Sequence, residues 1–238
     1  MRYLVTGGAG FIGANFVRSL LDGKDCAVAV LDLLTYAGSL ENLESVRGSG
    51  RFTFRKGDIR DAGAVGELAK GADVIVNFAA ESHVDYSISR PDAFFSTNVL
   101  GTLVLLEAAR KNDIEFVQIS TDEVYGDVVS GESAEGDRLV PSSPYSASKA
   151  GADLLVGSYA RTYGLSAKIT RTTNNYGPYQ HVEKLIPKLV AMALLGKRLP
   201  IYGNGKSVRE WIHVSDNCSG IETVIRKGKK GGYHHERV

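Results

Sequence analysis

The sequence predicts an α/β fold in which helices cover both faces of a parallel β-sheet, and two observations support this. Short runs rich in Val, Ile and Leu alternate along the chain with longer segments of helical periodicity. The apolar runs are also nearly continuous, which is typical of strands buried on both faces. The predicted strands lie at residues 3–6, 27–31, 52–56, 73–78, 116–120 and 167–171. The predicted helices lie at residues 11–21, 61–69, 91–111 and 144–163.

Length and composition narrow the class of protein. The chain has 238 residues, of which 43% are hydrophobic and 23% are charged, as expected for a globular protein with a sizeable core. No apolar run approaches the ~20 residues that a membrane-spanning helix needs. The N-terminus enters the first strand directly, without the pattern of a signal peptide, and Cys26 and Cys218 are isolated. We therefore expect a cytoplasmic protein without a metal site or a membrane partner.

The C-terminal part of the chain differs in character from the rest. After residue 171 the pattern becomes irregular, with a predicted helix at 184–195, a short strand at 199–202 and a last helix at 215–226. We therefore expect a large first domain at residues 1–171 and a small, truncated second domain at residues 172–238. The last 13 residues are basic and are interpreted as a solvated tail. Because the remainder is slightly acidic, no nucleic-acid partner is expected.

A glycine-rich turn joins the first strand to the first helix. Residues 6–13 read TGGAGFIG, which satisfies both G-x-G-x-x-G and G-x-x-G-x-x-G. Because strand, turn and helix stand in this order, the backbone can approach a pyrophosphate at the positive N-terminus of the helix. The turn thus indicates a Rossmann-type doubly wound sheet that binds a dinucleotide. The turn residues expected to line its site are Gly7, Gly10, Phe11, Ile12 and Gly13.

Residues at the ends of the next strands indicate which dinucleotide is bound. Asp32 ends the second strand, 19 residues after the last glycine of the turn. A carboxylate there accepts hydrogen bonds from the ribose hydroxyls and repels a 2′-phosphate, so NAD is the predicted cofactor. Asp58 and Ile59 end the third strand and are expected to hold the adenine. Ala79 and Ala80 end the fourth strand, where small residues let the backbone approach the cofactor.

A Tyr-x-x-x-Lys pair, Tyr145 and Lys149, lies in the predicted helix at 144–163. Residues i and i+4 share one face of a helix, so the ammonium is expected near the phenol. Ser143 as N-cap and Pro144 at the first position are expected to start the helix just before Tyr145. The ammonium and the helix end both favour the phenolate, and lowering its pKa from about 10 toward 7 requires roughly 4 kcal/mol. Such a phenolate takes a proton from an alcohol as hydride leaves for nicotinamide.

Three further polar residues follow the fifth strand, at the edge of the sheet where ligands bind. Thr121 is expected to hydrogen-bond the reacting hydroxyl. Asp122 and Glu123 are adjacent, so in extended chain their side chains point to opposite sides. Reduction of a ketone needs neither carboxyl group. An elimination needs both, because one group protonates a departing hydroxyl while the other removes a proton from carbon.

Together these motifs resemble a known family. The turn TGGAGFIG with a Tyr-x-x-x-Lys pair is the mark of the extended short-chain dehydrogenase/reductases that act on nucleotide sugars. Residues 79–85, 120–126 and 174–179 look like those of the dTDP-glucose 4,6-dehydratases, and the similarity runs from Met1 to about Lys227. The Asp-Glu pair after Thr121 discriminates within this group, because nucleotide-sugar epimerases generally carry other residues there.

The resemblance implies a lyase that converts dTDP-glucose to dTDP-4-keto-6-deoxyglucose with tightly held NAD. It implies that Tyr145 removes the proton of the C4 hydroxyl, Glu123 abstracts the C5 proton and Asp122 protonates the C6 hydroxyl. Residues 1–171 are thus expected to form the NAD-binding domain and residues 172–238 a partial nucleotide-sugar-binding domain. Thr97, Tyr145, Lys149 and Asn175 are expected to line the cofactor site. The implied substrate contacts are Ser82, Thr121, Asn174, Lys184, Leu185, Pro200, Ile201, Tyr202 and Arg209.

Several points stay open at this stage. Apolar stripes on the helices at 91–111 and 144–163 fit either the core or the surface of an expected homodimer. Tyr86 stands where related sequences often have Arg, and little effect is expected. The chain is also shorter than its family, so a catalytically weak or silent NAD-binding homologue is the main alternative to an active dehydratase. An epimerase or decarboxylase acting on a UDP-sugar is a further alternative, against which the Asp-Glu pair argues.

Overall fold

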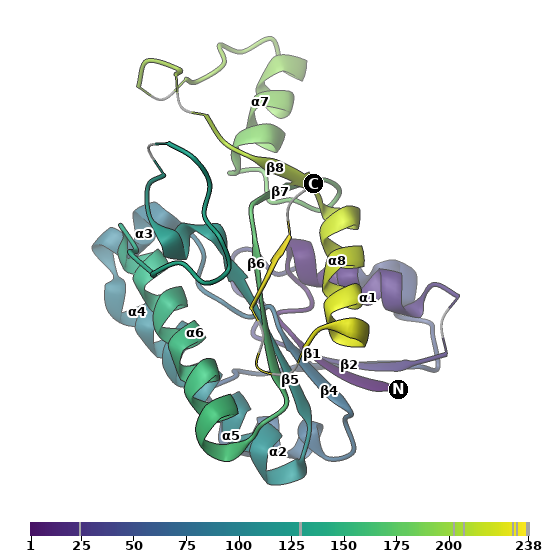
Figure 1. The fold of residues 1–238 in the computed structure, drawn as a ribbon. Helices are drawn as coiled ribbons and strands as arrows, with labels where there is room; N and C mark the ends of the chain where they lie inside the picture. The colour runs from purple at the N-terminus through teal and green to yellow at the C-terminus, as the bar shows by residue number, and fades with distance from the viewer. Residues whose placement is uncertain are drawn as a thin grey trace.

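A seven-stranded parallel sheet forms the centre of the computed structural model, which describes residues 1–23, 25–128, 130–201, 203–206, 208–229, 231 and 233–236 (Figure 1). The strand order is β3-β2-β1-β4-β5-β6-β9, and every neighbouring pair is parallel. The strands are β1 (Arg2–Thr6), β2 (Ala27–Asp32), β3 (Phe52–Lys56), β4 (Val74–Asn77), β5 (Glu115–Thr121), β6 (Ala167–Thr172) and β9 (Tyr233–Glu236). The chain runs outward from β1 in one direction and then in the other, so the predicted doubly wound sheet is confirmed.

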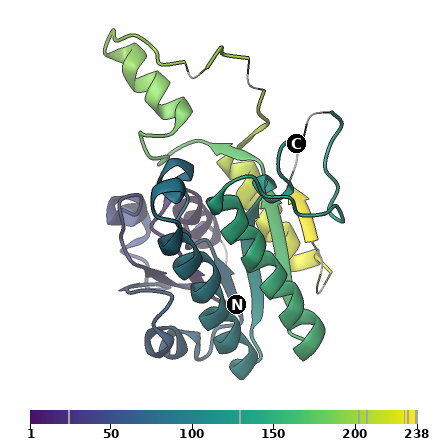
Figure 2. The same ribbon diagram turned by 90° about the vertical axis from the view of Figure 1, so that its left-hand side faces the viewer.

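Helices cover both faces of this sheet (Figures 1 and 2). One face carries α1 (Phe11–Leu21) and α8 (Val214–Lys227), which pack against each other. The other face carries α2 (Ala62–Ala69), α3 (Val84–Ser89), α4 (Pro91–Phe95), the π-helical turn η2 (Ser96–Gly101), α5 (Thr102–Asn112) and α6 (Pro144–Tyr163). Two short 3₁₀ helices, η1 (Leu40–Val46) and η3 (Asp122–Tyr125), follow β2 and β5. Both predicted helices at 11–21 and 144–163 are confirmed with their bounds.

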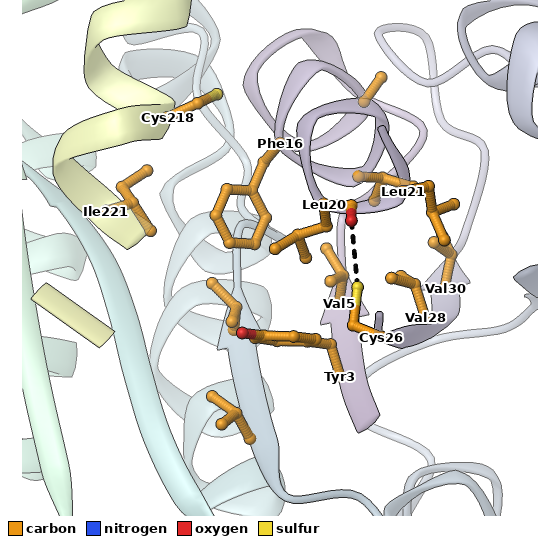
Figure 3. Close-up of a cluster of buried hydrophobic side chains, with 14 of the residues drawn as sticks. Tyr3, Val5, Phe16, Leu20, Leu21, Cys26, Val28, Val30, Cys218 and Ile221 are labelled. Carbon is orange, nitrogen blue, oxygen red and sulfur yellow. Dashed lines mark hydrogen bonds between the residues drawn. The ribbon is translucent and has the colours of Figure 1, made fainter. Parts of the chain in front are cut away.

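Alternating side chains of each central strand enter two separate cores. Tyr3 and Val5 of β1 lie in the core beneath α1 and α8, whereas Leu4 lies in the core beneath α5 and α6. Figure 3 shows the first of these cores, where Phe16 of α1 and Ile221 of α8 lie over the strands. Full burial of such a side chain contributes roughly 1.5–3 kcal/mol to stability. The sheet is therefore anchored on both faces, and its C-terminal edge is a rigid platform.

A smaller lobe lies beyond that C-terminal edge. It consists of the paired strands β7 (Asn174–Tyr176) and β8 (Trp211–His213) and the helix α7 (Leu185–Leu194). None of the residues of α7 is buried, and Leu194 is 83% exposed. The chain then returns to the main sheet through α8 and β9. Residues after 171 thus contribute both to the smaller lobe and to the main sheet with its helices. The division into two domains at 171/172 stays a prediction.

The predicted helix at 91–111 is interrupted by the π-helical turn η2, which sequence periodicity did not indicate. Two contacts accompany the wider turn. The side chain of Asn98 accepts a hydrogen bond from Glu81 N at 2.9 Å and donates one to Glu81 O at 3.1 Å. A Cβ atom at Gly101 would lie 2.4 Å from Cδ1 of Ile59. The wider turn thus brings Asn98 to the loop after β4 while the helix passes close to Ile59.

Two predictions for the C-terminal part were wrong. No strand occurs at 199–201, because Pro200 cannot donate to a sheet and both Leu199 and Ile201 are exposed; Tyr202 lies outside the described residues. The expected solvated tail instead supplies β9, which pairs with β6 from Ile169↔Tyr233 to Thr172↔Glu236. Strand β9 satisfies backbone groups of β6 that would otherwise form an open edge. Within the described ranges, no helix is both long enough and apolar enough to cross a membrane.

Gly126 closes η3 and provides a stability test. Its φ is 81°, and a Cβ atom there would lie 2.1 Å from the carbonyl oxygen of Val140. We expect Gly126→Ala to lower the free energy of unfolding by roughly 3–5 kcal/mol, from backbone strain plus overpacking. Gly131→Ala is the matched control, because its φ is 78° but no described atom lies within 4 Å of the position that the added methyl group would take. It should lose only about 1–2 kcal/mol. Urea unfolding measures both, and equal losses would contradict the steric explanation.

Candidate active site

A cleft of about 470 Å³ opens at the C-terminal edge of the sheet. It lies where the strand order reverses between β1 and β4, the place where doubly wound sheets bind ligands. Every residue predicted to contact the cofactor lines this one cleft. They are Gly7, Gly10, Phe11, Ile12, Gly13, Asp32, Asp58, Ile59, Ala79, Ala80, Thr97, Tyr145, Lys149 and Asn175.

The glycine turn brings backbone segments so close together that side chains at two of its positions would clash. Gly7 has φ 69°, and a Cβ atom on it would lie 2.5 Å from the backbone nitrogen of Ala79. A Cβ atom on Gly13 would lie 2.3 Å from Gly7 O. In the described chain no side chain caps the N-terminus of α1, where Gly10 is the N-cap residue. The first N–H groups of α1 are therefore left for an anion such as a pyrophosphate.

Asp32 stands where a ribose-binding carboxylate was predicted. It is 8% exposed and accepts hydrogen bonds from Ala9 N at 2.9 Å and Leu34 N at 2.8 Å. Burial raises the pKa of Asp32, and the two backbone hydrogen bonds oppose that rise. Asp58 instead bonds Arg60, whose guanidinium lowers the pKa of Asp58. The two acids thus hold different partners along one wall of the cleft.

Helix α6 begins as the sequence predicted and presents Tyr145 and Lys149 to the cleft. Ser143 is the N-cap and forms a capping box with Ser146, while Pro144 occupies the first turn. The Lys149 ammonium donates a hydrogen bond to Ile119 O at 2.6 Å. Burial lowers the pKa of Lys149 to about 8, and the Asp153 carboxylate opposes this effect.

The expected lowering of the Tyr145 pKa is not found. Burial raises that pKa, the Glu123 and Asp122 carboxylates raise it further, and a hydrogen bond from Thr121 opposes them. The prediction rested on the ammonium and the helix end, and it left out the desolvation of the phenol and its two anionic neighbours. Burial and the two carboxylates thus favour the neutral phenol of Tyr145 in the protein alone.

The turn η3 places Thr121, Asp122 and Glu123 in the same cleft. Thr121 is its N-cap, and its hydroxyl accepts a hydrogen bond from Glu123 N at 3.3 Å. Burial raises the pKa of both carboxyl groups, and for Glu123 the neighbouring Asp122 adds to the rise. Arg209 and Lys184 lower the pKa of Glu123. The two acids therefore experience different surroundings.

The predicted substrate contacts divide into two groups. Ser82, Thr121, Asn174, Lys184 and Leu185 line the cleft. Pro200, Ile201 and Arg209 do not line it, and Tyr202 lies outside the described residues. The Arg209 charge nevertheless acts on Glu123. The roles of these residues in binding a substrate stay predictions.

Sequence reasoning missed several residues of the lining. Thr172 ends β6 and Thr173 follows it, so the rule that ligands bind beyond the carboxyl ends of parallel strands could have found them. Gln180, His181 and Trp211 also line the cleft. They come from the loop before α7 and from β8, which no sequence pattern places beside α6.

Comparison with known proteins adds independent evidence. The GDP-mannose 4,6 dehydratase family matches residues 4–237. The low-salt glycan biosynthesis protein Agl12 of Haloferax volcanii is 58% identical over 232 residues, covering 97% of this chain and 75% of that protein. A dTDP-glucose 4,6-dehydratase of Mycobacterium tuberculosis is 50% identical over 235 residues, covering 97% and 70%. The crystal structure of DesIV, a dTDP-glucose 4,6-dehydratase from Streptomyces venezuelae with NAD bound, superposes with a TM-score of 0.96 at 53% identity, covering 99% and 75%.

Gly10 tests whether the glycine turn holds a dinucleotide. A Cβ atom there would approach Gly7 O only to 3.3 Å, so Gly10→Ala should change the free energy of unfolding by less than about 1 kcal/mol. The methyl group would, however, occupy the space at the N-terminus of α1. We expect the affinity for NAD to fall at least about tenfold, or ~1.4 kcal/mol, by titration calorimetry. Gly66→Ala on α2, with no described atom within 4 Å of its Cβ, is the control. Unchanged NAD affinity in Gly10→Ala would refute the assignment of the turn.

Proposed function

The chain belongs to the GDP-mannose 4,6 dehydratase family, and we propose that it dehydrates dTDP-glucose to dTDP-4-keto-6-deoxyglucose with NAD as cofactor. The sequence identity of 50–53% to the dTDP-glucose 4,6-dehydratases described above supports this proposal. One observation carries this proposal. The carboxyl groups of Asp122 and Glu123 share a cleft with Tyr145 and Lys149. One site therefore holds the groups for oxidation of an alcohol and those for elimination of water.

The chain's own residues fit NAD. The glycine turn packs so tightly that Gly7 and Gly13 leave no room for a Cβ atom, and α1 offers its uncapped N-terminus to the diphosphate. Asp32 is available at the ribose position. NAD bound there supplies the acceptor for a hydride from C4 of the sugar and the donor of a hydride to C6 later in the cycle.

Tyr145 is the base for the C4 hydroxyl in this proposal. Burial and the two carboxylates favour the neutral phenol in the protein alone, so Tyr145 must first lose its proton, which the charge of Lys149 and the positive charge of bound NAD would favour. The phenolate then accepts the hydroxyl proton while Thr121 holds the reacting oxygen. Lys149 supports the phenolate with its charge from the next turn of α6. The 4-keto group that results acidifies the proton on C5.

Glu123 and Asp122 carry out the elimination. Cations favour an ionised carboxylate more than neutral hydroxyl donors do. The charges of Arg209 and Lys184 lower the pKa of Glu123. The pKa of Asp122 is lowered only by hydrogen bonds, among them those from the neutral hydroxyls of Thr121 and Thr173. Glu123 is therefore the base that removes the C5 proton, and protonated Asp122 is the acid for the C6 hydroxyl.

The protons balance over the cycle. Asp122 gives one proton to the C6 hydroxyl, which leaves as water, and Tyr145 gains one from the C4 hydroxyl. Glu123 returns its proton to C5 as hydride reaches C6. The net loss from the sugar is one water molecule. Transfer of a proton from Tyr145 to Asp122, directly or through solvent, restores both groups.

A second candidate is a weak or silent homologue, and α7 is the observation that favours it. The chain spans 70–75% of the length of the relatives described above. No residue of α7 is buried, so the wall of the cleft that Lys184 and Leu185 contribute has little support. Turnover decides between the two candidates.

We also infer a homodimer in the cytoplasm. Helices α4 and α6 lie side by side (Figures 1 and 2). Phe95, Leu100 and Leu154 on α4, η2 and α6 are 44%, 55% and 63% exposed. Large apolar side chains on adjacent helices are typical of an isologous interface. The buried thiols of Cys26 and Cys218 suit a reducing compartment.

Replacing both acids tests the proposed reaction. Asp122→Asn with Glu123→Gln removes the acid and the base but preserves the shapes of the side chains. We expect NAD affinity to stay within about threefold and formation of the 4-keto-6-deoxy product to fall at least about 10³-fold. Product is followed by mass spectrometry after incubation with dTDP-glucose. Wild-type protein that binds NAD but forms no product would support the silent homologue, and turnover by the double variant would refute the roles of the two acids.

An aspartate on α6 tests the dimer. Leu154→Asp places a charge in the proposed interface, and we expect the sedimentation coefficient to shift from that of a dimer to that of a monomer at micromolar concentration. Leu194→Asp, at an 83% exposed position of α7, is the matched control and should leave the dimer intact. A monomeric wild-type protein would show that the exposed residues do not form an interface.

A further inference from the structure

A buried ion pair lies one helical turn from Lys149. Asp153 is 0% exposed and Arg171 is 3% exposed. The Arg171 Nε donates to Asp153 Oδ2 at 2.9 Å. Asp153 belongs to α6 and Arg171 to β6, and the mechanism described above uses neither.

Arg171 is itself fixed by the chain around η3. Its Nη1 donates to the hydroxyl of Tyr125 at 2.5 Å and to Glu135 O at 3.3 Å. The guanidinium also lies 4.9 Å from the centre of the Tyr125 ring. These contacts hold the guanidinium in place, so the Asp153 carboxylate has a defined position against α6.

Asp153 follows Lys149 by four residues, so both side chains lie on one face of α6. Lys149 is 4% exposed, and apart from its hydrogen bond to Ile119 O it lies in a largely desolvated setting. One carboxylate is thus ion-paired with Arg171 and acts through its charge on Lys149, one helical turn away. Burial raises the pKa of Asp153, and the charges of Arg171 and Lys149 oppose that rise. Protonation would leave the buried guanidinium of Arg171 without its ion-pair partner, which is strongly unfavourable in a low-dielectric interior, so the ion pair favours the carboxylate.

We propose that Asp153, held by Arg171, is a positioning residue that keeps the ammonium of Lys149 charged inside the cleft. A buried ion pair alone adds little to stability, but here a third charge, that of Lys149, depends on it. The consequence for catalysis rests on the function proposed above, in which Lys149 supports the phenolate of Tyr145. The effect on Lys149 itself does not rest on it.

The sign of the effect follows from the groups around Lys149. Tyr145 on α6 and Asp122 and Glu123 on η3 line the same cleft as Lys149. Asp153 follows Lys149 by one turn of α6, and Arg171 on β6 is bonded to Asp153. Burial lowers the pKa of Lys149 to about 8, and Asp153 is the carboxylate that opposes this. Removing the Asp153 charge therefore lowers the pKa of Lys149 further.

Labelling with cyanate measures this without substrate or cofactor, because only the neutral amine reacts. Carbamylation of each lysine is followed by peptide mass spectrometry as the pH is varied. We expect a midpoint near 8 for Lys149 in the wild type and a lower midpoint in Asp153→Asn. At pH 7 a fall of one pKa unit makes labelling about fivefold faster. Asp153→Glu keeps the charge and should return the midpoint toward the wild-type value, and exposed Lys70 should not change in any variant.

A purely structural role gives the opposite sign. Loosened packing would let water reach Lys149 and raise its pKa toward the ordinary value of about 10.4, so labelling at pH 7 would slow down. A slower or unchanged rate in Asp153→Asn would overturn the proposal. Lys168 is as buried as Lys149 but bonds Glu115 of β5 and Ile225 O of α8 and does not line the cleft. It therefore reports folding, because it is labelled only if the core opens.

A second variant guards against loss of folding. Asp153→Asn leaves the Arg171 guanidinium buried without its carboxylate, which is destabilising, whereas replacing both members of a buried pair is often neutral. In Asp153→Asn with Arg171→Met the Lys149 midpoint must still fall below the wild-type value. If it does and the protein also turns over dTDP-glucose, the falling limb of kcat at high pH should move to lower pH. A lowered carbamylation midpoint of Lys149 together with no turnover of dTDP-glucose by the wild type or any variant would refute the proposed function. It would leave the role of Asp153 intact.

Discussion

The site depends on the contact between the backbone of Gly7 and the backbone that leaves β4. A Cβ atom at Gly7 would lie 2.5 Å from Ala79 N and 2.6 Å from Phe78 C, so two chain segments meet with no side chain between them. Beneath this contact, Thr6 Oγ1 donates to Asn77 at 2.7 Å and Asn77 donates to Gln118 at 2.9 Å. These buried hydrogen bonds join β1, β4 and β5, whose ends carry the glycine turn, the Ala79 segment and η3. The core of the sheet therefore sets the distance from the glycine turn to Asp122 and Glu123.

Helix α6 is tied to the same platform through the π-helical turn η2. Asn98 of η2 bonds both backbone groups of Glu81 and donates to the Ser148 hydroxyl at 2.8 Å. Ser148 in turn donates to Tyr145 O at 2.7 Å. The N-terminal turn of α6 is thus linked to the loop after β4 by hydrogen bonds in addition to apolar packing. The start of α6 is linked to the loop after β4 through Asn98, and β5 is linked to β4 through Asn77 and Gln118. The phenol of Tyr145 and the two carboxyl groups of η3 are therefore held in fixed relative positions.

The parts of the fold that could be predicted are those that depend on residues close together in the sequence. Continuous apolar runs, helical periodicity and the Ser-Pro start of α6 each depend on neighbours in sequence, and β1 to β6, α1 and α6 follow them. The spacing of TGGAGFIG, of Asp32 and of the Tyr-x-x-x-Lys pair likewise places residues in the cleft.

Features that depend on contacts distant in sequence left no such pattern. The turn η2 depends on Glu81 and Ile59, β9 depends on the open edge of β6, and Trp211 reaches the cleft only because β8 pairs with β7. The pKa of Tyr145 was missed for the same reason, since desolvation and the nearby Glu123 exist only in the folded chain.

The charges in the cleft also favour an order for the two halves of the proposed reaction. Ionised Glu123 raises the pKa of Tyr145, so the base of the elimination and the base of the oxidation oppose each other when both are charged. Once Tyr145 has accepted the C4 proton, that repulsion ends and an ionised Glu123 is better tolerated. The cleft therefore reaches its most favourable charge state for removing the C5 proton only after C4 has been oxidised. Elimination before oxidation would require a base acting on an unacidified carbon beside a phenolate, which is the less favourable arrangement of the same groups.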